Sequence, residues 1–181
     1  MEKLLEEAKL HNPPAPEMVP INELYNPQYD VEEFMDVFGQ ELPEVPVIPD
    51  EKTCLLRARL IWEEALETIR AFGCDILALD SEGNGIGTIL SIELDTTLIP
   101  SIVEIADGCA DLLVVTHGAA LACGIDIYPV FNEVHRSNMS KMWKGENGPE
   151  VRRREDGKIT KSPDYSPADI SPILIDQGWE G

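Results

Sequence analysis

Two long segments with helical hydrophobic periodicity constrain the fold of this 181-residue chain more than any other feature. The first begins between Asp50 and Thr53 and ends at Gly73, a residue typical of helix C-termini. Its apolar residues recur at helical spacing and form a core face: Ala58, Ile61, Ala65, Ile69 and Phe72. The second runs from about residue 100 to residue 123 and is followed by a glycine. This pattern predicts an all-α core.

Shorter segments complete the predicted core. Asp30 is a good N-cap for a helix that reaches about Phe38. Val31, Phe34, Met35 and Phe38 are expected on one face of this helix. A third strong helix is expected to begin near residue 129 and to continue to about residue 143. Between the two long helices, residues 74–97 place two apolar runs around a cluster of Gly, Asn and Ser. This pattern predicts a small β-hairpin or an irregular flap.

Three regions are expected along the chain. Residues 1–29 are rich in proline after a short amphipathic start and form an N-terminal arm. Residues 30–144 form the core domain, which carries the hairpin insertion. Residues 145–181 are rich in Gly, Pro and charge, basic first and then acidic, and form a C-terminal tail.

The charge of the chain limits its partners. A formal net charge of −20 disfavours binding to nucleic acid or to an anionic membrane surface, because both would be repelled. The first ten residues are charged throughout and do not resemble a signal peptide, and the longest apolar stretch is short for a bilayer span. We therefore expect a soluble cytoplasmic protein.

Both long helices carry clustered carboxylates. Glu63, Glu64 and Glu67 lie within little more than one turn of the first helix. On the second helix, Glu104, Asp107 and Asp111 share a face, since positions i, i+3 and i+7 align on an α-helix. Small residues continue that face and would let another helix approach closely.

The segment that carries the second group of acids has no lysine or arginine to neutralise them. Between Ala71 and His135 the chain has ten Asp and Glu residues and no Lys or Arg. Either acidic motif alone is most often a solvated helix face. Together, on the edges of amphipathic helices, they indicate carboxylates that take up protons or bind a cation. All-oxygen ligation suits Mg²⁺ or Mn²⁺.

The positive charge is concentrated elsewhere. Eight of the fourteen Lys and Arg residues lie between Arg136 and Lys161, which suggests a place for an anionic ligand such as phosphate. Asn138 and Lys141, three residues apart, are expected on one face of the third helix, and Lys161 is a further candidate for substrate binding. No Walker-type phosphate loop occurs.

The acidic motifs "EEALE" and "EIAD", followed by "NMSK", resemble the all-α nucleotide pyrophosphohydrolases, the MazG-like and phosphoribosyl-ATP-pyrophosphohydrolase-like proteins. The resemblance covers roughly residues 30–170 and is strongest to members with dUTPase-type and phage dNTPase activity. It implies a MazG-like helical bundle that assembles as a homodimer or homotetramer. Such enzymes convert a nucleoside triphosphate to the monophosphate and pyrophosphate with Mg²⁺ or Mn²⁺, two or more ions per site.

The resemblance also implies roles for individual residues. The metal ligands would be Glu64, Glu67, Glu104 and Asp107. Glu63 would orient or deprotonate the attacking water, and Asn138 and Lys141 would contact phosphate. Asp111 would have an outer-shell or sugar-binding role.

Two questions about function stay open at this point. With dUTP as substrate the enzyme would keep uracil out of DNA, and with dGTP it would remodel the nucleotide pool, as some phage enzymes do. The alternative from another class is an acidic DNA mimic or interaction protein, with its acids spread over an exposed surface and no dependence on metal.

Overall fold

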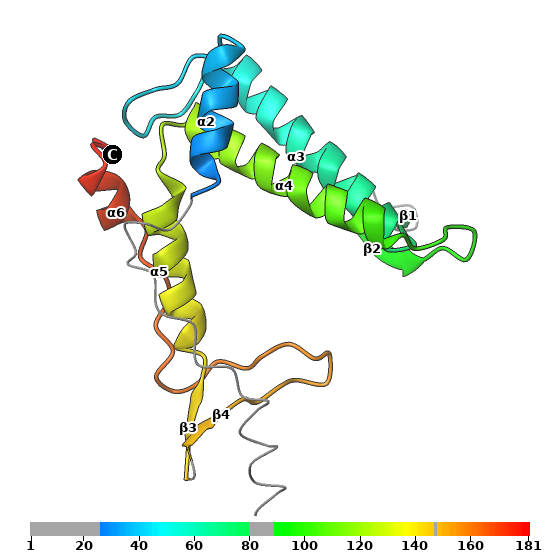
Figure 1. Cartoon of the computed structure of the whole chain (residues 1–181). Coiled ribbons are helices and arrows are strands. Elements are labelled where there is room, and N and C mark those ends of the chain that lie inside the picture. The colour runs from blue at the N-terminus through cyan, green and yellow to red at the C-terminus, as the bar shows by residue number, and fades with distance from the viewer. Residues whose placement is uncertain (1–25, 80–88, 147) are drawn as a thin grey trace, which may run out of the picture.

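The structure is a computed structural model, and it describes residues 26–79, 89–146 and 148–181 (Figure 1). Helices dominate these ranges, and the strands form two small antiparallel sheets of two strands each. The elements in chain order are α2 (Gln28–Val37), α3 (Glu51–Ala71), β1 (Cys74–Leu79), β2 (Ile89–Leu94), α4 (Ile102–Ala122), α5 (Ile127–Met139), β3 (Trp143–Gly145), β4 (Gly148–Glu150) and α6 (Ser171–Asp176). The prediction of an all-α fold with a small hairpin insertion is confirmed.

Helices α3 and α4 lie side by side and antiparallel (Figure 1). Helix α3 begins where the sequence predicts, and Asp50 caps it: Asp50 Oδ1 accepts a hydrogen bond from the Thr53 amide at 2.7 Å. Ser101 caps the N-terminus of α4. The β1–β2 hairpin joins the two helices at one end, with Cys74 paired to Leu94. The predicted hairpin insertion is therefore present, although its residues 80–88 lie outside the described ranges.

Helices α3 and α4 approach each other closely where Gly108 of α4 meets Thr68 of α3. A Cβ at Gly108 would lie 2.5 Å from Thr68 Oγ1, so only glycine allows this approach. Thr68 is buried and its hydroxyl donates to the Glu64 carbonyl at 2.7 Å. The small-residue face predicted for α4 is thus confirmed as the packing face.

The predicted core face of α3 is wrong for the single chain. Ile61 and Phe72 are exposed by 38% and 50%, whereas the neighbouring stripe with Leu60, Glu64 and Thr68 turns towards α4. The reason is that Gly108 offers close approach only to the stripe around Thr68. A large apolar face of α3 is left uncovered.

Helix α2 packs across the C-terminal end of α4. Val31 and Met35 are buried there, together with Leu121 and Ala122. The predicted burial of Phe34 and Phe38 on the same face is wrong for the single chain, because these rings pack against each other and stay 50% and 68% exposed. The helix begins at Gln28, two residues before the predicted Asp30, because the buried Gln28 side chain fixes its first turn. Gln28 Nε2 donates to the Ile125 carbonyl at 2.9 Å, and its Oε1 accepts from the amide of Ile127, the first residue of α5, at 3.0 Å.

Helix α5 leaves this junction in a different direction from α3 and α4 (Figure 1). It begins at Ile127, capped by Asp126, and ends at Met139 rather than at the predicted Trp143. It stops early because the tail returns here: Ser162 Oγ donates to the Ser140 carbonyl at 2.8 Å, which a longer helix would use internally.

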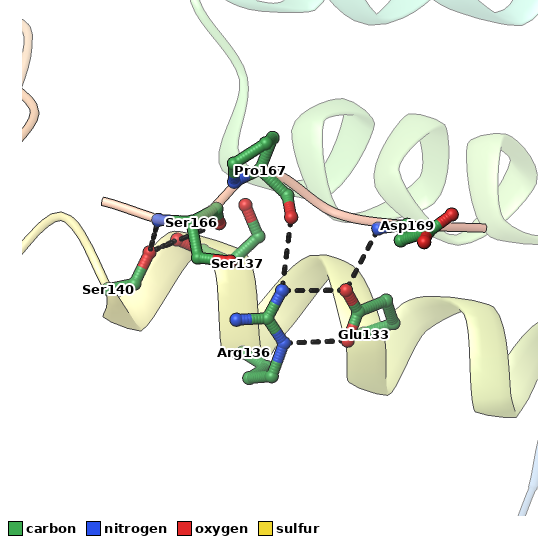
Figure 2. A network of polar contacts seen from close by, with 7 residues as sticks. All are labelled: Glu133, Arg136, Ser137, Ser140, Ser166, Pro167 and Asp169. Atoms are coloured by element: carbon green, nitrogen blue, oxygen red, sulfur yellow. Dashed lines mark hydrogen bonds and ion pairs between the residues drawn. The ribbon is translucent and has the colours of Figure 1, made fainter. Parts of the chain in front are cut away.

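The tail is ordered along α5. We name residues 162–170 the C-terminal strap; Figure 2 shows its contacts with that helix. The Ser166 amide donates to Ser140 Oγ at 2.9 Å, and Arg136 donates to the Pro167 carbonyl at 3.1 Å. Arg136 also forms a bidentate ion pair with Glu133 and lowers the pKa of that carboxyl to about 2.

Among the described helices, α4 is long and apolar enough to cross a membrane by length and composition. It packs against both α2 and α3 and carries Glu104, Asp107 and Asp111 along its length. Much of its apolar surface is nevertheless exposed in the single chain, including Ile102, Val103 and Leu113.

Candidate metal and nucleotide site

Carboxylate charges of both α3 and α4 act on Glu64. This half-buried side chain lies one turn before Thr68, the residue that contacts Gly108 of α4. Burial raises the pKa of Glu64, and the charges of Asp111, Glu67, Glu63 and Asp107 raise it further. Residues far apart in sequence therefore form one acidic cluster, as the paired motifs predict.

The members of the acidic cluster differ in exposure. Glu63, Glu67 and Asp107 are exposed, whereas Asp111 is half-buried beside Glu64. Glu104 lies in the first turn of α4, where its amide donates to Ser101 Oγ at 3.3 Å, and it is not among the charges that act on Glu64. Among the charges that raise the pKa of Glu64, that of Asp111 has the largest effect.

No ion pair found among the described residues involves the acidic cluster; the pairs involve other Asp and Glu residues. The chemistry of the donors fits a hard divalent cation, since all are carboxylate oxygens with unneutralised charge. In the part of the chain that the structure describes, no three such side chains meet closely enough to hold a metal ion as placed. Repulsion between like charges favours separation of the carboxylates when no cation lies between them.

The candidate phosphate ligands lie at the far end of α5. Lys141 Nζ donates to Asn138 Oδ1 at 2.7 Å, so these residues lie together as their spacing predicts. The Lys161 ammonium stands 4.2 Å from the centre of the Tyr165 ring. A hydrogen bond with Ser137 lowers the pKa of Tyr165, and the charges of Lys161 and Lys141 lower it further.

These lysines border a cleft of about 640 Å³, which we name the basic cleft. Its charged lining consists of Lys141, Arg154, Lys158 and Lys161. Arg154 pairs with Asp156 at 2.7 Å, while Lys141 and Lys161 have no carboxylate partner within the described ranges. Arg154 and Lys158 belong to the predicted C-terminal tail. Only the fold, which brings them to the same cleft as Lys141, makes them candidates for ligand binding.

One chain does not bring the acidic cluster and the basic cleft together. Asp111 lies about 17 Å along α4 from Ala122, and Asn138 lies about 17 Å along α5 from Ile127. The two helices diverge from the junction between these ends (Figure 1). Among the described elements, α5 forms no extensive packing with α3 or α4.

Sequence reasoning missed Arg57. It lies on the same face of α3 as Leu60 and Glu64, at helical spacing, which is the signal that could have found it. Its guanidinium lies between α2 and α4, where Nη2 donates to Gln40 Oε1 at 2.6 Å. Burial lowers the pKa of this arginine.

Paired carboxylate motifs on two adjacent helices are the arrangement that the resemblance to nucleotide pyrophosphohydrolases implies. Residues 31–138 match the phosphoribosyl-ATP pyrophosphohydrolase family, and this range is more than half of the chain. The chain belongs to that family of nucleotide pyrophosphohydrolases, whose MazG-like members are generally dependent on divalent metals. The match confirms the resemblance drawn from the motifs. The comparison with curated proteins gives no match.

The matched range contains the whole acidic cluster and Asn138, while Lys141 and Lys161 lie beyond it. The acidic cluster is thus part of the family domain. The basic cleft is built largely by the tail that follows the domain.

Proposed function

We propose that this protein is a metal-dependent nucleoside triphosphate pyrophosphohydrolase. It converts a (d)NTP, with dGTP or dUTP favoured, to the monophosphate and pyrophosphate. The observation that carries this proposal is the acidic cluster around Glu64, in a domain of the pyrophosphohydrolase family. The enzyme would act in the cytosol of a bacterium or of a phage-infected host, in sanitation or remodelling of the nucleotide pool.

Each carboxylate has a proposed role. Glu64, Glu67, Glu104 and Asp107 hold Mg²⁺ or Mn²⁺, and Asp111 supports the site from the outer shell or binds the sugar. Bound divalent ions neutralise charge on the phosphate oxygens. Glu63 is exposed beside Glu64 and accepts a hydrogen bond from water, orienting its oxygen for in-line attack on the α–β anhydride. Its carboxylate takes the proton that the water loses.

A second copy of the chain completes the site in this proposal. Asn138, Lys141 and Lys161 contact the phosphates of a nucleotide held on the acidic cluster of another copy, since they lie far from their own. The uncovered apolar side chains support an assembly: Ile61, Trp62 and Phe72 of α3 are all more than a third exposed. We propose a homodimer or a homotetramer.

Pyrophosphate release from a panel of dNTPs and NTPs tests the activity. Wild type is compared with Glu67→Gln and with Glu51→Gln, which makes the same charge change about 24 Å away on α3. Metal-dependent release should be lost in Glu67→Gln and retained in Glu51→Gln. No release from any nucleotide by folded, metal-loaded protein would favour the acidic binding protein instead.

Mixing two inactive variants tests whether a second copy of the chain completes the site. Glu67→Gln has intact lysines, and a Lys141→Ala/Lys161→Ala variant has an intact acidic cluster. If the site is shared, the mixture regains activity that neither variant has alone. If each chain is complete by itself, the mixture stays inactive under conditions where labelled copies exchange.

A further inference from the structure

A pocket next to the acidic cluster has the character of a binding site for an organic ring. It lies between α2, α3 and α4 and has a volume of about 350 Å³, within the range of small-molecule sites. Its walls are mostly apolar and include Phe34, Leu60 and Val115. Two polar side chains, Gln40 and Arg57, interrupt them.

The pocket adjoins the acidic cluster on both long helices. Leu60 lies one turn before Glu64 on α3, and Val115 lies one turn after Asp111 on α4. Arg57 is about 10 Å from Glu64 along the axis of α3. This spacing suits a nucleotide whose phosphates lie at the carboxylates and whose base lies in the pocket, with the sugar between them.

Arg57 is a half-buried cation in a strongly acidic chain, and it forms no ion pair within the described ranges. Gln40 accepts from its Nη2 at 2.6 Å and fixes the plane of the guanidinium. Its Nε is buried without a hydrogen-bond partner. Arginine has five N–H donors, so the guanidinium in this pocket still has donors to offer.

Gly118 of α4 makes room for this guanidinium. A Cβ at Gly118 would lie 3.1 Å from Arg57 Nη1, closer than ordinary van der Waals contact. The glycine therefore lets the charged end of Arg57 lie against the floor of the pocket. Met35 contributes a sulfur 3.9 Å from Nη2, a weak acceptor that leaves the donor capacity of Arg57 largely unused.

We propose that this pocket binds the nucleobase of the substrate and that Arg57 selects bases with a ring keto group. This rests on the proposed function, because it places a nucleotide on the acidic cluster. Guanine presents O6 and N7 as two acceptors, to which arginine binds with two hydrogen bonds, and uracil presents O4. Adenine and cytosine present an amino group at the equivalent position, which cannot accept from a guanidinium.

The test compares substrates that differ at this group. The value of kcat/KM is measured by pyrophosphate release for dITP against dATP and for dUTP against dCTP. Wild type should prefer the keto member of at least one pair by about 5- to 150-fold, the range of one well-formed bidentate pair. The pair with the larger ratio identifies a purine or a pyrimidine substrate.

Two matched variants assign the preference to Arg57. Arg57→Met should reduce the ratio to within about threefold, by losing activity on the keto substrate. Arg59→Met removes the same charge from an exposed position two residues along α3 and should keep the wild-type ratio. Should Arg57→Met fail to fold, Arg57→Lys and Gln40→Leu replace it, and both should reduce the ratio.

The proposal is overturned if wild type releases pyrophosphate without a keto preference. It is also overturned if Arg57→Met lowers activity on all substrates equally, or if it alters only the assembly state, which would mean that a second copy fills the pocket. These results leave the pyrophosphohydrolase activity standing. Absence of release from every nucleotide would instead refute the proposed function itself.

Discussion

The contact between Gly108 and Thr68 sets the spacing of α3 and α4, and Gly108→Ala should loosen it. The added Cβ would lie 2.5 Å from Thr68 Oγ1 and 3.2 Å from Thr68 Cα. The hydroxyl cannot turn away freely, because it donates to the Glu64 carbonyl at 2.7 Å, a bond that contributes about 1 kcal/mol. Overpacking of this kind costs about 1–3 kcal/mol.

Helix propensity opposes this effect, since alanine is favoured over glycine by about 1 kcal/mol in a helix. Overpacking together with the weakened hydrogen bond, less the gain in helix propensity, leaves a net loss of about 1–3 kcal/mol. This corresponds to about 2–12 °C in Tm for a chain of this size. Urea unfolding followed by circular dichroism measures the free energy. Ala110→Gly, at an exposed position on α4, measures the propensity contribution alone.

A double-mutant cycle makes the test specific. Thr68→Ala removes the oxygen that the new Cβ would strike, so Gly108→Ala should cost less in that background, by at least about 0.5 kcal/mol. Wild-type or higher stability of Gly108→Ala would refute the close-approach argument. Additive effects of the two substitutions would refute the assignment of the clash to Thr68.

Four further outcomes are expected. Because burial and neighbouring carboxylates raise the pKa of Glu64, its ionised form destabilises the metal-free fold as pH rises. Glu64→Gln should therefore melt above wild type at pH 7 and match it below about pH 4. Mn²⁺ at a hundred times Kd should stabilise wild type by about 2.7 kcal/mol, and no shift in Tm would contradict the metal site. Because the pKa of Glu133 is lowered from 4.5 to about 2 in the fold, its ionised carboxylate stabilises the protein at pH values above 4.5. Glu133→Gln should therefore be less stable than wild type at pH 7. In acid titration this difference should disappear as the pH falls towards about 2. Asp50→Ala should cost about 1 kcal/mol in urea unfolding by removing the cap on the Thr53 amide.

The sequence by itself determined the helices, the hairpin and the acidic cluster, because each depends on local signals. Hydrophobic periodicity and caps such as Asp50 define α3 and α4. The i, i+3, i+7 spacing places Asp107 and Asp111 on one face, and the absence of nearby Lys and Arg leaves their charge without partners. The family match agrees with the motifs, since these residues lie within its range.

Tertiary structure alone decided which faces pack and which sites lie apart. Helix α3 packs against Gly108 of α4 through the stripe around Thr68. The apolar face of α3 that contains Ile61 therefore stays uncovered, although its periodicity predicts a core face. The direction of α5 depends on the buried Gln28 and on the returning strap, two contacts between residues distant in sequence. For that reason no local pattern could show that Lys141 lies far from Glu64, or that Arg57 lies in a pocket beside it.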